Sequence, residues 1–304
     1  MAATPSDPGG PPGYVLNWER AADRTLPVKA PAGWAIEYDV NQRHNPGNEA
    51  QARSATGPVE PVRSGTHSVR FQLYKGDKRF RCGVRSELAV DPPEPPRSSP
   101  AKPVERWYGF SIYLPHTWQP DRSPESVTQW HQDANSAGGS PPLALLTMRP
   151  GNDTKSHWFI SQRMWNTPET VNTDVGVCAL GAWTDWVVHI KWSADSTGPG
   201  RGLLEIWQNG KPVAGFNPKY GRNTFTNSTR HYLKIGIYKW QWNRAAPPQL
   251  LPPGSGPCPV PGNDPSTSTR RVMYHDEVRI VDGRGTRATV TPPGNRPPPV
   301  PPPP

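Results

Sequence analysis

Residues 232–242 read YLKIGIYKWQW, and this stretch decides which fold the sequence predicts. Successive side chains of a β-strand point to opposite faces. The odd positions Leu233, Ile235 and Ile237 therefore form an apolar stripe for a core, while the even positions carry phenols, indoles and an ammonium group. Such a strand indicates a sheet that covers a core on one side and offers a platform for an anionic or sugar-like ligand on the other.

The rest of the chain predicts an all-β fold. Its 304 residues include 42 prolines and 28 glycines, which disfavour long helices. Short alternating runs bounded by turn residues recur, as in sandwiches and barrels. GLLEIWQNGKPV is typical of a hairpin that turns at Asn209-Gly210. We expect strands over residues 34–39, 67–74, 81–90, 106–113, 126–132, 143–148, 157–162, 184–193, 202–208, 231–239 and 271–281.

The two ends of the chain are low in complexity. We expect a disordered segment over 1–13, one domain over 14–290, and a disordered proline-rich tail over 291–304. Two loops, 91–103 and 245–269, interrupt the domain, and loops this long are usually functional or disordered. No apolar run reaches the ~20 residues of a membrane span. The N-terminus lacks the apolar core of a signal peptide, so we expect a mature, secreted chain with no membrane partner.

The charge and the aromatic content indicate the class of ligand. The net charge is +9 without a long basic run, which favours an acidic polymer. Thirteen tryptophans favour a sugar, because indole faces stack on pyranose rings. Nucleic acid could also stack on them, but no basic-aromatic motif of the RRM or cold-shock type is present. We therefore expect a monomer that binds an acidic polysaccharide and no nucleic acid.

The three cysteines lack the spacing of a zinc site. Cys82 has the opposite parity to Arg85 and Glu87, so it is expected in the core. Cys178 and Cys258 lie near loop-rich sequence and are the expected disulfide pair.

Three segments place polar side chains on one face of a strand. Taken singly, each has an ordinary explanation: a surface ion pair, a structural histidine or an exposed sheet face. Taken together, they indicate strands that line a groove. The residues are Arg85 and Glu87 in GVRSEL, Gln129, His131 and Asp133 in VTQWHQD, and Tyr232, Lys234 and Tyr238 in YLKIGIYKW.

These motifs resemble the R-S-E, Q-x-H and Y-x-K-x-G-x-Y signature of jelly-roll polysaccharide lyases, including alginate lyases. The closer resemblance is to the glucuronan lyase and heparin lyase I-like group, through WYGFSIYLP, PPLAL, HIKWS, LEIWQNG, YLKIGIYK and YHDEVRI. It implies a concanavalin-like β-jelly roll, a sandwich of two antiparallel sheets with a concave substrate groove. It also implies β-elimination at a uronic acid, in glucuronan or a related glucuronic-acid polymer.

The chemistry explains the residue types in these motifs. Removal of the proton at C5 adds charge beside a carboxylate, so Arg85 and Gln129 are expected to neutralise and hydrogen-bond that group. Tyr238 matches the catalytic tyrosine of the family and is expected to act as base, acid or both. The reference pKa of a phenol is about 10, and a cation such as Arg85 or Lys234 favours the ionised form.

The identity of the key histidine stays open at the level of sequence. His131 is one candidate, as a second proton carrier or as a partner of the substrate carboxylate. The resemblance also points to His67, because glucuronan lyase-like enzymes use a histidine in that region. However, His67 shares its parity with Val69 and Phe71, which would turn it toward the core.

The remaining candidates concern substrate and metal. Lys239 has the wrong parity for the polar face unless the strand bends there. The resemblance implies a structural calcium on Asp276 of YHDEVRI, with Glu37 or Asp39 as partners, and no cofactor for catalysis. Substrate-binding candidates are Lys234, Tyr232, Glu87, Arg149, Arg163, Trp165, Trp240, Trp242 and His44.

Two other function classes compete with the lyase. A retaining glycoside hydrolase needs two carboxylates about 5–5.5 Å apart, and the usual E-x-D-x-x-E strand motif is absent. A lectin would need the aromatic face but not the combined motifs. The Lys-Trp pair after Tyr238 replaces the Asn-Gln common in alginate lyases, which argues against alginate, while heparin and ulvan stay open.

Overall fold

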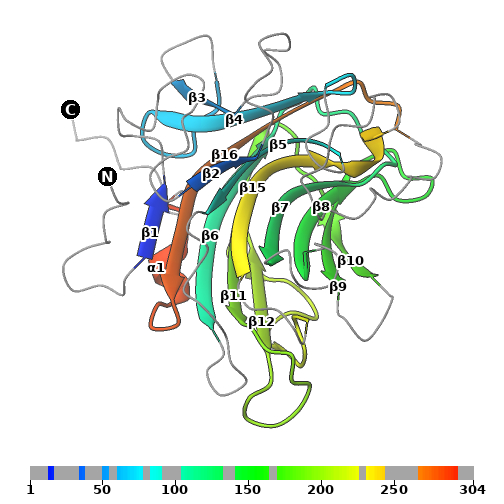
Figure 1. The fold of residues 1–304 in the computed structure, drawn as a ribbon. Helices are drawn as coiled ribbons and strands as arrows, with labels where there is room; N and C mark the ends of the chain where they lie inside the picture. Colours follow the sequence, from blue (N-terminus) through cyan, green and yellow to red (C-terminus); the bar gives the residue numbers. More distant parts are fainter. Residues whose placement is uncertain are drawn as a thin grey trace, which may run out of the picture.

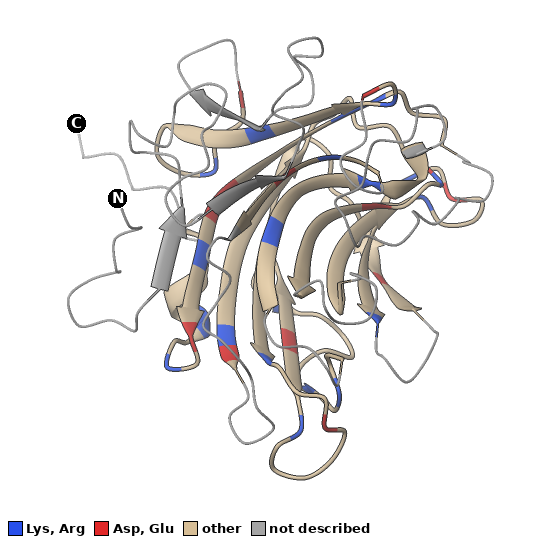
Figure 2. Cartoon of the chain, in the orientation of Figure 1, with Lys and Arg blue, Asp and Glu red and all other residues tan. Residues whose placement is uncertain are grey.

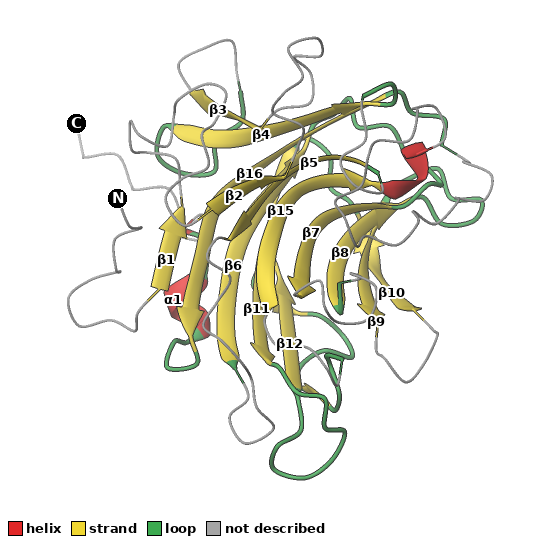
Figure 3. Cartoon of the chain, viewed as in Figure 1, coloured by secondary structure: helices red, strands yellow, loops and turns green. Residues whose placement is uncertain are grey.

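The structure, a computed structural model, describes residues 13–16, 34–37, 50–54, 60–77, 83–90, 104–132, 141–163, 170–225, 231–243 and 266–293. In the first three stretches only the course of the backbone is described. The described chain is almost entirely strand (Figure 3), apart from the short helices η3 (Trp240–Asn243) and α1 (Arg287–Val290). Within these residues, no helix has the length and apolar character needed to cross a membrane.

Two antiparallel sheets make up the fold (Figure 1). The nine-stranded sheet runs in the order β13 (Lys211–Pro212), β12 (Leu203–Gln208), β11 (Ala182–Lys191), β6 (Glu105–Leu114), β16 (Arg270–Asp282), β4 (His67–Tyr74) and β3 (Ala50–Ser54), with β14 (Lys219–Tyr220) beside β12 and β1 (Gly13–Leu16) beside β16. The seven-stranded sheet runs in the order β10 (Thr170–Val177), β9 (His157–Arg163), β8 (Leu143–Met148), β7 (Glu125–Gln132), β15 (His231–Lys239), β5 (Val84–Val90) and β2 (Trp34–Glu37).

The core lies between the two sheets. Leu233, Ile235 and Ile237 of β15 are fully buried and belong to one cluster with Phe110 and Met273 of the nine-stranded sheet. The alternation of YLKIGIYKWQW therefore predicts the core face of this strand correctly. Burying each of these aliphatic side chains stabilises the fold by about 1.5–3 kcal/mol. The all-β sandwich expected from the sequence is confirmed.

The expected strands are all present within the described residues. The expected hairpin is confirmed as well: Gln208 pairs with Lys211, and Asn209 and Gly210 both have positive φ, as a type I′ turn requires. The sequence patterns missed β1, β3, β10, β14, η3 and α1. Most of the loops 91–103 and 245–269 and of the two chain ends lies outside the described residues, so the domain boundaries stay predictions.

The expected disulfide is wrong. Cys178 carries a free thiol that is 5% exposed and belongs to the main core cluster. Burial raises the pKa of this thiol, which keeps it protonated and inert. Loop-rich flanking sequence does not distinguish a small core residue from a bridge. Cys82 and Cys258 lie outside the described residues.

On the outer face of the nine-stranded sheet, His189 joins three strands. Its Nδ1 lies 2.7 Å from Glu205 and its Nε2 lies 2.7 Å from Glu105, while its ring stacks on Trp107 with the centroids 3.8 Å apart. Burial lowers the pKa of His189, but the hydrogen bonds and charges of the two glutamates outweigh it and raise the pKa above its usual range. The protonated ring is thus the stabilising form.

This arrangement predicts a pH-dependent stability. Because the folded-state pKa of His189 is raised, its contribution is complete below the unfolded pKa of about 6.5 and is lost as the pH rises through the folded value. We expect the melting temperature of the native chain to exceed that of His189→Gln at pH 6, and the gap to shrink by pH 9. Calorimetry of both proteins across this range measures the gap. A gap that is constant or widens with pH would contradict the assignment.

Candidate functional site

The three motif strands lie side by side in the seven-stranded sheet, in the order β7–β15–β5 (Figure 1). Residues directly opposite one another in an antiparallel pair share a face. Across β15 and β5, Tyr238 pairs with Arg85; across β15 and β7, Lys234 pairs with Gln129 and Tyr232 with His131. The motif residues therefore share the outer face of this sheet, as the sequence predicted.

Tyr238 and Arg85 form the centre of this face. The guanidinium carbon of Arg85 lies 3.8 Å from the centroid of the Tyr238 ring, which is cation–π contact. Trp240 lies beyond, with its ring centroid 5.7 Å from that of Tyr238. A guanidinium held against the ring face places a fixed positive charge next to the Tyr238 side chain, which favours the ionised form of the phenol.

Glu87 is buried and binds the side chains of both Arg85 and Gln129. Its carboxylate, 1% exposed, accepts a hydrogen bond from the Gln129 amide and pairs with Arg85 Nη1 at 3.2 Å. A buried carboxylate with both partners occupied fixes the orientation of the side chains around it. The prediction that Glu87 contacts substrate is not supported by this position, because Glu87 faces Arg85 and Gln129.

Lys234 and the His131–Tyr232 pair complete the face. Lys234 is fully buried, and its Nζ lies 5.5 Å from the Tyr232 ring centroid. Tyr232 Oη lies 3.3 Å from His131 Nδ1. The platform expected from the sequence is thus buried at Lys234: parity places the ammonium group on this face but does not determine how deeply it lies.

A β-bulge in β15 lies directly before Tyr238 and sets the orientation of its side chain. Opposite β7, the register of β15 shifts between Ile235 and Tyr238, where Gly236 adopts φ +121°. A Cβ on Gly236 would lie 2.2 Å from the Ser86 carbonyl oxygen. Only glycine fits here, which is the physical reason for the glycine of the Y-x-K-x-G-x-Y motif.

Gly83, which the sequence patterns missed, limits the position of the Tyr238 ring. A Cβ at Gly83 would lie 2.4 Å from Tyr238 Cε2 and 2.9 Å from Trp240 Cα. The sequence does show a glycine two residues before Arg85. However, its contact with Tyr238 follows only from the register of β5 against β15, which the sequence does not give. The Tyr238 ring is therefore packed between Gly83 and Arg85.

Gly83→Ala should lower turnover far more than stability. The added methyl group displaces the Tyr238 ring, and a displacement of about 1 Å at a reacting group can cost about 100-fold in rate. Gly76→Ala is the matched control, because a Cβ at Gly76 meets nothing within 4 Å. Initial rates and melting temperatures of both variants test this. Equal rates in the two variants would contradict the packing role of Gly83.

The remaining candidates are dispersed. Arg149 follows β8, where its backbone N–H donates to the Asp121 carbonyl, and exposed Arg163 at the end of β9 donates to Thr170 at the start of β10. Trp240 packs against a small apolar cluster of β8 and β9. Trp242 is 1% exposed, because the strand ends at Lys239 and η3 breaks the alternation.

Several candidates do not reach these strands or are not described. His67 begins β4 in the nine-stranded sheet, 9% exposed and 2.7 Å from Thr66 Oγ1, so it is not among the strands that carry Tyr238. This agrees with its parity. His44, Asp133 and Trp165 lie outside the described residues.

Of the expected calcium residues, Asp276 and Glu37 lie in different sheets, and Asp39 lies outside the described residues. Asp276 lies in β16 of one sheet, whereas Glu37 lies in β2 of the other and pairs with Glu87. Asp276 Oδ2 accepts the backbone N–H of Arg63 at 2.9 Å, and Oδ1 accepts that of Glu277 at 2.7 Å. Burial raises its pKa to about 8. Among the described residues no three metal-ligating side chains cluster, so they do not by themselves fit a calcium ion, and the metal stays a prediction.

Blue and red segments are scattered over the described strands in Figure 2 without a long basic run, in agreement with the diffuse positive charge of the sequence. Within the seven-stranded sheet, the polar face of the motif strands carries formal charges of +1 on Arg85, −1 on Glu87 and +1 on Lys234. Cationic side chains thus outnumber anionic ones among these three motif residues. Such a site is suited to a ligand carboxylate.

Comparisons with known proteins agree with this geometry. A family model described as "Polysaccharide lyase" matches residues 35–279. No curated protein sequence matches the chain. Among solved structures, an endo-β-1,4-glucuronan lyase from the fungus Trichoderma reesei is 17% identical, with a TM-score of 0.56 over 86% of this chain and 98% of that one.

Two alginate lyases show the same architecture. The exolytic enzyme AlyA5 from Zobellia galactanivorans is 12% identical, with a TM-score of 0.51 over 84% of this chain and 96% of that one. Aly36B is 13% identical, with a TM-score of 0.51 over 91% of this chain and 99% of that one. At these identities the likeness shows the fold, a jelly roll of two antiparallel sheets.

Proposed function

The chain belongs to the polysaccharide lyase family, and from this premise we propose that it cleaves a uronic-acid polymer by β-elimination, glucuronan or a related glucuronic-acid polysaccharide. The observation that carries the proposal is the stacking of Arg85 on Tyr238, with Gln129 on the next strand of the same face. These are the groups that the reaction needs: a cation and an amide for the substrate carboxylate, and a phenol for the proton.

The first step removes the proton at C5 of the uronate. The carboxylate at C6 lies against Arg85 and the Gln129 amide, which stabilise the charge that develops on it. Ionised Tyr238 takes the proton, and the electron pair of the C5–H bond is delocalised into the carboxylate. The fixed positive charge of Arg85 supports this role, because Arg85 shares one face of the sheet with Gln129 and Tyr238.

The second step breaks the bond from C4 to the glycosidic oxygen. The electron pair from C5 forms the C4–C5 double bond, and the departing oxygen takes a proton. In a syn elimination Tyr238 returns the proton that it removed, so that one phenol serves as base and then as acid. The alternative proton donor in this proposal is His131, whose Nδ1 lies 3.3 Å from Tyr232 Oη on the same face. The products are a new reducing end and an unsaturated uronate.

A polymer panel tests the proposal. The protein is incubated with glucuronan, alginate, heparin, hyaluronan, ulvan and xanthan while the ultraviolet absorbance of the unsaturated uronate is recorded. We expect the fastest rise on a polymer that contains glucuronic acid. New reducing ends without absorbance would indicate hydrolysis, and binding without either would indicate a lectin; both outcomes overturn the proposal.

A further inference from the structure

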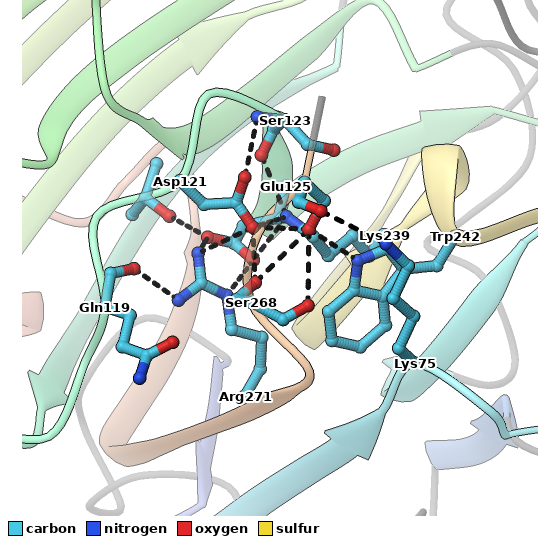
Figure 4. A network of polar contacts seen from close by, with 11 residues as sticks. Lys75, Gln119, Asp121, Ser123, Glu125, Lys239, Trp242, Ser268 and Arg271 are labelled. Carbon is cyan, nitrogen blue, oxygen red and sulfur yellow. Dashed lines mark hydrogen bonds and ion pairs between the residues drawn. The ribbon is translucent and has the colours of Figure 1, made fainter. Parts of the chain in front are cut away.

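A buried cluster of four charged residues lies at the end of the strand that carries Tyr238. Lys239 Nζ lies 3.2 Å from both Asp121 Oδ2 and Glu125 Oε2. Arg271 donates to the two oxygens of Glu125, with both distances 2.7 Å. All four side chains are at most 1% exposed. Figure 4 shows Asp121, Glu125, Lys239 and Arg271 pointing toward one another.

The cluster connects the two sheets. Glu125 begins β7 and Lys239 ends β15 in the seven-stranded sheet, whereas Arg271 lies in β16 of the nine-stranded sheet. Thr147 of β8 also donates to Glu125. Formal charges of two acids and two bases cancel, so the cluster is neutral as a unit. It therefore holds strand ends from opposite layers at a fixed separation.

Two members of this cluster are neighbours of Tyr238 in the sheet. Lys239 is the next residue along β15, and Glu125 is the residue before Ser126, the β7 residue that pairs with Tyr238. Because side chains alternate along a strand, Tyr238 points to the outer face while Lys239 points to the cluster. The position of the Tyr238 backbone is thus set by ion pairs on the reverse side of the sheet.

The β15–β7 ladder is weakest at this point. The bulge between Ile235 and Tyr238 interrupts the regular backbone pairing with β7. Beyond the bulge, Lys239 Nζ donates to the Ser123 carbonyl at 2.8 Å, which links the end of β15 to the segment before β7. The Lys239 side chain therefore connects the two strands where their backbone hydrogen bonding is irregular.

The turn after Tyr238 is held by the same cluster. Trp242 Nε1 donates to Ser266 Oγ at 2.8 Å, and Ser266 and Ser268 both donate to Asp121. Burial raises the pKa of Asp121, but the Lys239 charge and these hydroxyls outweigh it and lower the pKa to about 2. Asp121 is therefore an anion throughout the working range and a constant partner for Lys239.

Burying four charges is a poor way to gain stability, because desolvation offsets most of the attraction, and such clusters are better explained by what they fix in space. We propose that Lys239 and the cluster of Asp121, Glu125 and Arg271 position Tyr238, holding its backbone behind the bulge so that the phenol stays stacked on Arg85. This role rests on the proposed function of Tyr238. Lys239 is a positioning residue and does not contact the substrate.

The test compares Lys239→Met with Arg63→Met. Arg63→Met breaks a part-buried pair with Asp185, 2.8 Å apart, on the outer face of the nine-stranded sheet, so it destabilises the fold without contacting β15. If Lys239→Met does not fold, the charge-balanced double variant Lys239→Met/Glu125→Gln replaces it. Steady-state rates on the polymer cleaved by the native chain are measured well below each melting temperature, with hydrogen exchange of the peptide over residues 232–243.

We expect Lys239→Met to lower kcat by about tenfold or more with KM changed by less than about twofold. The peptide over 232–243 should exchange faster than in Arg63→Met, which should keep the native kcat. A native kcat together with native exchange in Lys239→Met would overturn the positioning role. If the native chain cleaves no polymer, the proposed function fails, and the exchange comparison still decides whether Lys239 holds the strand.

Discussion

Tyr238→Phe should lose turnover while it keeps its substrate. The variant removes one hydroxyl and leaves the ring that Arg85 and Gly83 pack against. General acid–base catalysis by a positioned side chain is usually worth about 10²–10⁴-fold in rate, so we expect a fall of this size in kcat. The affinity for the polymer, measured by titration calorimetry, should change little, because Arg85 and Gln129, the expected partners of the substrate carboxylate, are unchanged.

A second tyrosine on the same strand and face provides the control. Tyr232→Phe removes the hydroxyl that lies 3.3 Å from His131 and leaves Tyr238 intact. If Tyr238 carries the proton, Tyr232→Phe should retain most of the native kcat. If the two variants lose turnover equally, or if Tyr238→Phe loses binding along with turnover, then the phenol of Tyr238 is not the group that moves the proton.

Much of this site is predictable from the sequence, because β-strand periodicity assigns side chains to faces. Leu233 and Ile235 fall on the core face, and Lys234 and Tyr238 on the other, as YLKIGIYKWQW predicts. The adjacency of β5, β15 and β7 does not follow from periodicity. The matched polar faces predicted only that the three strands line one groove, and the register of the strands adds that they are neighbours in the order β7–β15–β5.

The features that escaped the sequence depend on long-range packing. The edge strand Thr170–Val177 is mostly exposed, so it has no apolar stripe to mark it. Gly83 acquires its role only through contact with Tyr238, which lies far away in the sequence. The alternation of the strand correctly placed Lys239 away from the polar face. What it could not show is that Lys239 pairs with Asp121 and Glu125 on the reverse side of the sheet.

Arg85 offers the second large effect, because it serves both the fold and the chemistry. Arg85→Met removes the Arg85 cation that pairs with Glu87, which is 1% exposed, and breaking one side of a buried ion pair costs about 3–5 kcal/mol. The variant also loses the only guanidinium stacked on Tyr238 among the described residues. We expect a marked loss of stability in urea unfolding together with the loss of lyase activity.

The double variant Arg85→Met/Glu87→Gln separates the two effects. The amide that replaces the Glu87 carboxylate is neutral and still accepts a hydrogen bond from Gln129, so no unpaired charge is left in the interior and most of the lost stability should return. Activity should not return, because no cation then stabilises the charge that develops on the substrate carboxylate. Glu87→Gln alone completes the thermodynamic cycle and keeps Arg85 on Tyr238. If the double variant recovered turnover along with stability, Arg85 would be a structural partner of Glu87. Another group on this face would then have to neutralise the substrate carboxylate, and among the described motif strands Lys234 is the other cation on this face.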